Sequence, residues 1–286
     1  MAELESPPYE LVLEPSRGGF RFSWREFLEY RDLLRLLVER DFISRYKQTV
    51  LGPVWFIFQP MLTTAVFALV FSHIAGISTG TVPAPIFYWS GLLAWNYFAQ
   101  NIAIGGNTFT NNAGLFSKVY FPRVIVPLAV VIGNLGTLAI QSVAFAGLVA
   151  IYALQGAATN LHPDWHLLLL PLVVAQLAVL SLAFALIFSA LTAKYRDLSH
   201  LNQYLVQLWM FATPIIYPTT QIPAKWHWVM LANPAAVPVE MFRGFLLGQT
   251  NLQAGEIVFS VILTLLLFLI GMVLFQRVAR TVVDTA

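Results

Sequence analysis

The chain has 286 residues, of which 58% are hydrophobic and only 10% are charged, with a net charge of +2. A soluble domain carries about 25% charged residues, so this composition excludes a water-soluble protein and predicts an integral membrane protein. Cysteine is absent, which excludes disulfides, haem attachment and thiolate metal sites. The acidic, proline-containing start is unlike a secretory signal peptide, so none is expected.

The start of the chain is predicted to lie beside the membrane. Residues 1–22 are expected to be a flexible cytosolic lead, and residues 23–50 an amphipathic helix in the membrane interface. Ser23 followed by Glu26 has the spacing of a capping box, which favours a helix start. The segment carries one apolar face but too much charge to span. A soluble helix packed on a partner is the alternative.

The remainder, residues 51–286, is predicted to be the transmembrane domain. A spanning helix needs roughly 20 apolar residues, and six segments meet this need. They are 54–75, 86–106, 124–152, 167–192, 198–216 and 256–275. The third is long enough to tilt or protrude, and the fifth is the shortest. We therefore expect an all-α integral membrane protein with six transmembrane helices.

The positions of Lys and Arg orient these spans. With the N-terminus in the cytosol, fourteen of the sixteen Lys and Arg residues fall inside, and only Lys225 and Arg243 fall outside. Cytoplasmic loops carry the excess of positive charge in membrane proteins, so both termini are predicted to be cytosolic. Two short cytosolic loops follow from this topology, namely residues 111–123 and the charged turn at 194–198. A short helix along the membrane surface is expected in the first.

Residues 217–255, on the predicted external side, are too apolar for a solvated loop and too interrupted to span. Prolines divide the segment, and they are Pro218, Pro223, Pro234 and Pro238. Two re-entrant half-helices before the last span are predicted, because irregular backbone at membrane depth must be buried in protein or line a cavity. Two interfacial helices that lie flat are the alternative. Glu240 and Arg243 have the spacing of a local ion pair; a gating role is the other interpretation.

Several kinds of chemistry are missing from the sequence. The phosphate-binding motif GxxxxGK[ST] does not occur, so we expect no ATP hydrolysis by that route. The five His residues are scattered, and no carboxylate cluster offers a metal site. Charge within the predicted spans is nearly absent, whereas ion-coupled carriers keep ionisable groups at membrane depth.

Uncharged polar and aromatic side chains are the features that remain in the spans. Asn96, Gln100 and Asn107 lie on one helical face, where amides either line a polar path or join helices by hydrogen bonds. Aromatic rings crowd the first two spans, and their faces suit stacking on the C–H surfaces of sugars. An interfacial belt explains the outer rings equally well, but it explains Trp95 and Phe98, nearer mid-span, less well. The candidate substrate path consists of Trp55, Tyr88, Trp89, Trp95, Asn96, Phe98 and Gln100.

Motifs from about Tyr30 to Arg280 resemble the membrane subunits of ABC-2-type exporters, in the branch that exports polysaccharides and polyol phosphates. Each motif is weak alone, but their order and spacing are specific for the branch. They are Tyr30–Leu34, Arg40–Asp41, Arg45–Trp55, Gln59–Pro60, Ser117–Arg123, Tyr195–Leu198, Thr213–Pro218, Asn233–Pro234 and Phe242–Gly244.

The resemblance implies a homodimeric pore joined to two copies of a separate nucleotide-binding ATPase subunit, which would hold the ATP and Mg. It also implies that the cytosolic loops and the N-terminal helix couple to that ATPase. The candidate coupling residues are Arg40, Arg45, Asn112, Lys118, Tyr120, Phe121, Arg123, Tyr195, Arg196 and Asp197. The half-helices would cap the exit, with Tyr217, Pro218, Glu240 and Arg243 as the candidate external gate.

The expected function is therefore export of a lipid-linked polysaccharide, such as O-antigen, across a bacterial inner membrane. The chain is expected to bind no cofactor and no nucleic acid, and to be no enzyme itself. One alternative keeps the family and changes the cargo to teichoic acid, capsule or a small hydrophobic compound. Two others are a membrane-embedded glycosyl- or acyltransferase, which needs ionisable catalytic residues at the membrane face, and a passive channel or scaffold.

Overall fold

The computed structural model describes residues 29–44, 54–116, 118–119, 121–156, 161, 164–195, 197–249 and 252–281. Within these residues every regular element is a helix, as predicted. The predicted lead 1–22, the proposed helix start at Ser23 and residues 45–50 lie outside the described residues. Four helical segments are long and apolar enough to span a membrane: Trp55–Ile74, Ile125–Leu154, Trp165–Lys194 and Ala254–Arg280. The chain is therefore a multi-pass membrane protein.

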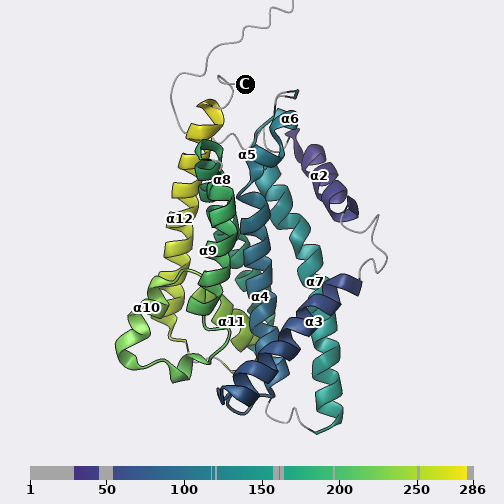
Figure 1. The fold of residues 1–286 in the computed structure, drawn as a ribbon, viewed down its shortest axis with the longest axis vertical. Coiled ribbons are helices and arrows are strands. Elements are labelled where there is room, and N and C mark those ends of the chain that lie inside the picture. Colours follow the sequence, from purple (N-terminus) through teal and green to yellow (C-terminus); the bar gives the residue numbers. More distant parts are fainter. Residues whose placement is uncertain are drawn as a thin grey trace, which may run out of the picture.

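Helix α4 (Ala84–Gly105) is the centre of the bundle. It contacts α7 (Ile125–Leu154) and α8 (Leu170–Lys194), and most of its side chains are buried. Figure 1 shows α4 running the length of the molecule between these helices. The helix has 22 residues and no charged side chain, so its length of about 33 Å matches a bilayer core. Its Trp and Tyr residues lower its mean hydropathy, and α4 is not among the four segments named above. The total of six transmembrane helices therefore stays a prediction.

The best-packed helix pair is α8 with α12 (Ala254–Thr281), which lie side by side in Figure 1. Their contact depends on a glycine, because a Cβ atom at Gly271 would lie 2.6 Å from the carbonyl oxygen of Ala183. A similar approach joins α4 to α8, where a Cβ atom at Gly105 would lie 2.8 Å from that of Ala185. Small residues at such crossings let helix backbones approach closely in membranes.

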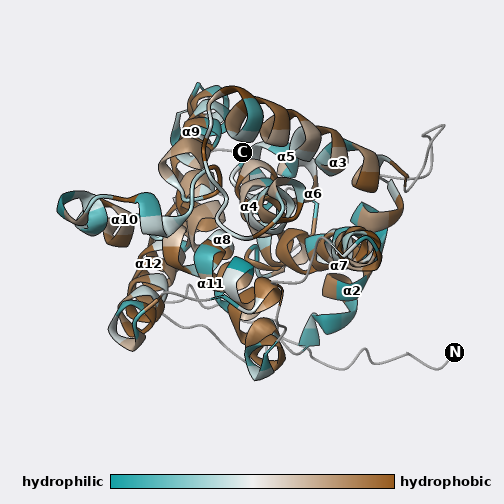
Figure 2. Ribbon diagram, turned by 90° about the horizontal axis from the view of Figure 1, so that it is seen from below, coloured by the Kyte–Doolittle hydropathy of each residue, from teal (hydrophilic) through white to brown (hydrophobic). Residues whose placement is uncertain are grey.

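Helix α3 (Trp55–Phe67) continues as a π-helix, η2 (Ala68–Ile74), and crosses the bundle obliquely. Seen along the bundle in Figure 2, α3 lies across α4 rather than parallel to it. Only Pro60 and Thr64 are buried in α3, whereas many of its large apolar side chains are exposed. The helix therefore leaves one apolar face unpacked by the rest of the described chain.

Helix α9 (Leu198–Ala212) ends earlier than the predicted span 198–216. Thr213 is extended, with φ −100° and ψ 141°, because Pro214 disfavours helical backbone at the residue before it. Its 15 residues are fewer than a spanning helix needs. The chain then turns within the bundle, since Pro214, Ile215 and Ile216 are buried.

Helix α2 (Arg31–Ser44) packs against the protein itself at one end of α7. Leu37 is 2% exposed and joins a small core with Phe121, Ile125 and Val126. The amphipathic pattern predicted from the sequence is therefore present, and its apolar face is covered largely by α7. Some apolar surface remains on this helix, as Leu36 is 60% exposed.

The two short cytosolic loops of the predicted topology lie at one end of the bundle, which we call the α5–α6 end. It is formed by α5 (Thr108–Asn111), α6 (Ala113–Phe116) and the adjoining ends of α7, α8, α9 and α12. Helix α2 lies beside it in Figure 1. The opposite end, which we call the α10 end, carries η3 (Trp165–Leu169), η4 (Thr219–Gln221), η5 (Ala224–Trp226) and α10 (His227–Ala232).

The two helices predicted as a re-entrant pair differ in their surroundings. Helix α11 (Ala236–Leu247) is buried on nearly every side and contacts α4 and α8. Helix α10 lies at the outside, with Trp228 65% exposed and only Met230 buried. The structure thus places α11 inside the protein, as expected of a re-entrant half-helix, whereas α10 lies on the surface as in the alternative interpretation.

Candidate functional site

At the α5–α6 end, the predicted coupling residues fall into an exposed group and a packed group. Arg40, Lys118, Tyr195 and Asp197 are exposed or partly exposed. Arg40 pairs with Asp41 on α2 at 2.7 Å, and Lys194 lies 5.1 Å above the ring of Tyr195. Asn112 is half-buried and donates to the carbonyl of Thr108. Arg45, Tyr120 and Arg196 lie outside the described residues.

Arg123 belongs to the packed group, because its side chain makes contacts within the chain. Its guanidinium donates a hydrogen bond to the carbonyl of Ala279 near the end of α12 and lies 5.4 Å from the centre of the Phe116 ring. The last carbonyls of a helix have no partner within the helix, and a cation there also suits the helix dipole. Arg123 therefore connects the loop before α7 to the end of α12 through this hydrogen bond.

Aromatic rings reinforce this connection. Phe109 of α5 stacks on Phe275 of α12 with ring centroids 4.8 Å apart. Phe116 lies 5.8 Å from Phe109 and 5.7 Å from Phe121, and Phe121 also packs on Leu37 of α2. A continuous set of contacts thus joins α2, the α5–α6 loop and α12.

Most aromatic residues of the predicted substrate path are packed inside the described chain. Trp95 and Phe98 are buried against Trp209 of α9, with ring centroids 6.3 and 5.3 Å away. Phe184 of α8 completes this cluster, 4.8 Å from Trp209. Tyr88 and Trp89 are buried near the α10 end of α4. In this arrangement the four rings join helices, a packing role that was not among the alternatives considered for them above.

Trp55, by contrast, is 48% exposed on α3. Asn96, Ala99, Gln100 and Ala103 are partly exposed on one side of α4, and Ile104 on the same side is 37% exposed. These residues form what we call the α4 stripe, the one face of this central helix that its neighbours in the described chain leave partly open. The two amides of this stripe, Asn96 and Gln100, are unfavourable against hydrocarbon, so they are suited to face water, a polar ligand or another protein surface. Asn107 lies beyond the end of the helix, where its side chain donates to the carbonyl of Ala103 at 2.9 Å.

A neighbouring set of polar residues joins three helices, and the sequence did not reveal it. Asn101 of α4 donates to Ser181 of α8 at 2.9 Å and accepts from Asn134 of α7 at 2.6 Å. The three side chains are at most 1% exposed. The sequence showed these polar residues in apolar spans, but it could not show that they meet. This network performs the packing role that was one interpretation of the amides.

At the α10 end, Glu240 and Arg243 form an ion pair within α11, with side chains 7% and 3% exposed. Arg243 also donates to the carbonyl of Pro214 at 2.8 Å and lies 4.2 Å from the centre of the Phe87 ring. Glu240 accepts from the hydroxyl of Thr219 at 3.1 Å. The pair thus connects α11 to α4 and to both ends of the turn after α9, where the other predicted gate residues, Tyr217 and Pro218, are half-buried.

Among the described residues, no group of three or more His, Cys, Asp or Glu side chains is placed to hold a metal ion. The ion pair of α11 uses both of its charges in internal contacts. The arrangement thus joins the α5–α6 loop to α2 and α12, and it leaves the amides of Asn96 and Gln100 and the ring of Trp55 partly exposed.

Comparison with known proteins gives the family. The family model described as ABC-2 type transporter matches residues 32–247. The O-antigen export system permease protein RfbA of Myxococcus xanthus is 33% identical over 199 residues, which cover 69% of this chain and 73% of that protein.

Two further relatives extend over more of the chain. An RfbA protein of the same description from Klebsiella pneumoniae is 27% identical over 248 residues, or 86% of this chain and 92% of that protein. The polysialic acid transport protein KpsM of Escherichia coli is 23% identical over 239 residues, or 83% and 90% of the two chains. The chain is a multi-pass membrane protein that belongs to the ABC-2 type transporter family.

Proposed function

We propose that this chain is the permease subunit of an ATP-driven exporter that carries a lipid-linked polysaccharide of the O-antigen type across a bacterial inner membrane. The observation that carries the proposal is the agreement of relatives named as O-antigen export permeases over as much as 86% of the chain. The exposed ring of Trp55 and the partly exposed amides of Asn96 and Gln100 suit a sugar polymer, whose surface alternates C–H faces with hydroxyl groups.

The energy source in this proposal is a separate ATPase subunit that binds ATP and Mg, whereas the chain itself binds no cofactor. Support comes from the sequence, which contains no phosphate-binding motif of its own. The exposed residues of the α5–α6 end are the proposed contact surface, with both termini in the cytosol. They are Lys118, Tyr195 and Asp197, with the half-buried Asn112 and with Arg40 of the neighbouring helix α2. Arg45, Tyr120 and Arg196 lie outside the described residues and are proposed from the sequence alone.

The working unit in this proposal is a homodimer with two ATPase subunits. The α4 stripe supports it, because the partly exposed amides of Asn96 and Gln100 in a membrane protein need a polar or protein neighbour. The exposed apolar surfaces of α3 and α9 flank α4 and suit contact with lipid or with a second copy. In such a dimer Asn96 and Gln100 are the best candidates for the polymer path, with Trp55 near its edge.

A capsule polysaccharide is a second candidate cargo, because one relative is named as a polysialic acid transport protein. It shares less sequence with this chain, 23% against 33% identity, so the O-antigen type is preferred. Surface polysaccharide composition in a strain that lacks the gene separates the two, since only the exported polymer disappears from the cell surface.

Affinity purification of the tagged chain from its native membrane tests the proposal. We expect an equimolar nucleotide-binding subunit in the purified complex, with ATP hydrolysis that vanadate inhibits. A clean homo-oligomer without a bound ATPase contradicts the ATP-driven mechanism. Glycosyl or acyl transfer by the purified chain alone would instead favour a membrane-embedded enzyme.

A further inference from the structure

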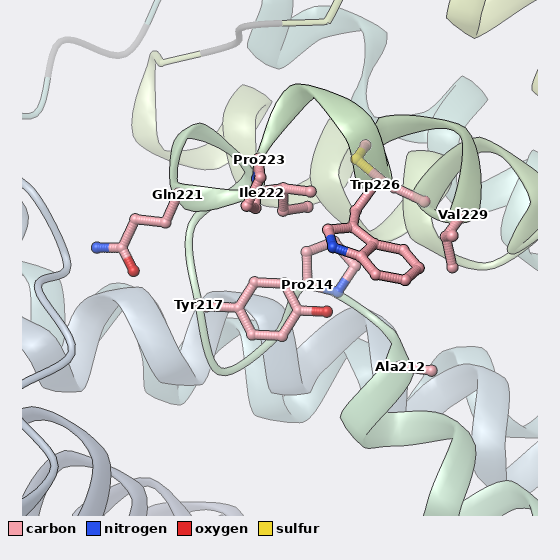
Figure 3. Close-up of a pocket in the computed structure, with 9 residues that line it drawn as sticks. Ala212, Pro214, Tyr217, Gln221, Ile222, Pro223, Trp226 and Val229 are labelled. Carbon is pink, nitrogen blue, oxygen red and sulfur yellow. The ribbon is translucent and has the colours of Figure 1, made fainter.

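A pocket at the α10 end has aromatic rings, prolines and aliphatic side chains in its walls. Its volume is about 460 Å³, and it lies between the end of α9 and the segment from η4 to α10 (Figure 3). The rings of Tyr217 and Trp226 lie on either side of Pro214 in this view, with Gln221 at one edge. Pockets of this volume lined by aromatic rings and a few polar groups are typical ligand sites.

The polar groups of this pocket are available to a ligand. Neither the hydroxyl of Tyr217 nor the indole N–H of Trp226 has a hydrogen-bond partner among the described residues. A tyrosine hydroxyl is protonated at neutral pH, because its ordinary pKa is about 10, so the hydroxyl of Tyr217 can donate. The amide nitrogen of Gln221 is occupied by the carbonyl of Ser78 at 2.9 Å, which leaves its amide oxygen to accept.

The elements that form the walls are fixed in place by hydrogen bonds. Arg243 holds the carbonyl of Pro214 at 2.8 Å, and Gln221 is tied to Ser78. Asn233 accepts from the indole of Trp209 at 2.8 Å and donates to the hydroxyl of Thr213 at 3.0 Å, just before Pro214. A binding surface that is held before its ligand arrives avoids part of the entropic cost of binding.

A second pocket of about 450 Å³ shows what a lipid-type surface looks like in the same chain. It lies among α8, α11 and α12 and is lined mainly by Leu, Val and Ile. The polar side chains in its wall are Gln176 and Thr264, and both are bonded to Ser260. A hydrocarbon chain suits that pocket, whereas the unpaired donors and ring faces of the Tyr217–Trp226 pocket suit a ligand with both C–H faces and hydroxyl groups.

We propose that the Tyr217–Trp226 pocket binds a sugar ring of the exported polymer at the α10 end of the protein. The inference rests on the proposed function and assigns a ligand-binding site to it. The Nζ atom of Lys225 lies 6.0 Å from the centre of the Trp226 ring, over one face. The other face of Trp226 and the ring face of Tyr217 carry the negative part of the aromatic quadrupole and pack on the C–H face of a pyranose. The hydroxyl, indole and amide groups at the pocket edge bond the hydroxyl groups of the sugar and set its orientation.

The test is direct binding to the purified full-length chain, with its copurified subunits, in lipid nanodiscs. The probe is the host cell's own surface polysaccharide, released from its lipid by mild acid and titrated calorimetrically. We expect Trp226→Ala and Tyr217→Ala each to weaken binding about tenfold, which matches the loss of one aromatic contact. Trp226→Phe keeps a ring and is expected to restore most of the affinity.

Trp228→Ala is the matched control, because Trp228 lies two residues away and is 65% exposed but does not line the pocket. It is expected to bind as the wild type does. Equal binding by all variants, an equal loss in Trp228→Ala, or no binding by the wild type overturns the site. The proposed function is tested separately, by complementation of a deletion strain. If Trp226→Ala binds the polysaccharide as the wild type does and also restores export, the proposed function stands and only the pocket assignment is wrong.

Discussion

The guanidinium of Arg243 in α11 donates to the backbone carbonyl of Pro214, 2.8 Å away in the turn that follows α9. Arg243 also pairs with Glu240 and lies on the face of the Phe87 ring in α4. One buried side chain therefore fixes the positions of three segments at the α10 end. Because Pro214 also lines the Tyr217–Trp226 pocket, the packing of α11 and the shape of that pocket depend on each other.

Removal of one charge from this pair is expected to destabilise the protein strongly. In Arg243→Met, the carboxylate of Glu240 stays buried without its partner, which typically costs about 3–5 kcal/mol. The loss of stability is measured as a fall in the melting temperature of the protein in detergent, with the folded protein that remains after heating quantified by size-exclusion chromatography. The double variant Glu240→Gln with Arg243→Met removes both charges and is expected to recover a large part of the stability. A single variant as stable as the wild type contradicts a buried, paired state.

The crossing of α8 and α12 gives a prediction with a matched control. Gly271→Ala places a methyl group 2.6 Å from the carbonyl oxygen of Ala183, so we expect a loss of about 1–3 kcal/mol from overpacking. Gly147→Ala adds the same methyl group within α7, where no atom lies within 4 Å. It is expected to be neutral or slightly stabilising. Equal effects of the two changes on the melting temperature argue against the close crossing.

Arg123 is expected to matter for coupling rather than for contact with the ATPase. Arg123→Ala frees the carbonyl of Ala279 and removes one of the two connections between the α5–α6 loop and α12, the stack of Phe109 on Phe275 being the other. We expect the ATPase subunit to copurify normally, while the amount of polysaccharide exported per ATP hydrolysed falls several-fold. Lys118→Ala, in the same loop but exposed, removes a positive charge without breaking an internal bond. Reduced ATPase binding in Arg123→Ala would place Arg123 in the intersubunit contact instead.

Trp95 and Asn96 are neighbours in α4 that were both predicted to lie on the substrate path, but they differ in burial: Trp95 is packed on Trp209, whereas Asn96 is partly exposed. Trp95→Ala opens a cavity beside Trp209 and is expected to cost about 3–5 kcal/mol, so folded protein is lost. Asn96→Leu changes the partly open α4 stripe and is expected to leave the melting temperature nearly unchanged while export falls. Measured together, melting temperature and surface polysaccharide separate packing from transport. A stable Trp95→Ala variant that fails to export would return Trp95 to the polymer path.

Residues with strong local signals were placed well from the sequence. Long apolar runs gave α3 with η2, α4, α7 and α8 within a few residues, because membrane helices must satisfy their backbone internally. The ion pair of Glu240 and Arg243 follows from helical spacing alone. The early end of α9 had a visible cause in Pro214, but the apolar residues after it extended the predicted span to Ile216.

Contacts between distant segments were beyond reach of the sequence pattern. In α4, aromatic rings occur on every side, so periodicity could not separate Trp95, packed on Trp209, from Asn96, partly open. Arg123 looked like a loop residue available to a partner because its bond to Ala279 joins positions 156 residues apart. The same limit hid the meeting of Asn101 with Asn134, since only the crossing of α4 and α7 brings the two amides together.

The sidedness of lipid-linked polysaccharide in a strain that lacks this gene tests the central claim most directly. Spheroplasts of the deletion strain would be treated with a glycosidase or lectin that cannot cross the inner membrane. We predict that the polymer accumulates at the cytosolic face, where the glycosidase or lectin cannot reach it. Reintroduction of the wild-type gene is expected to make the polymer accessible to the probe again. Full access of the probe to the polymer in the deletion strain would contradict a role in export.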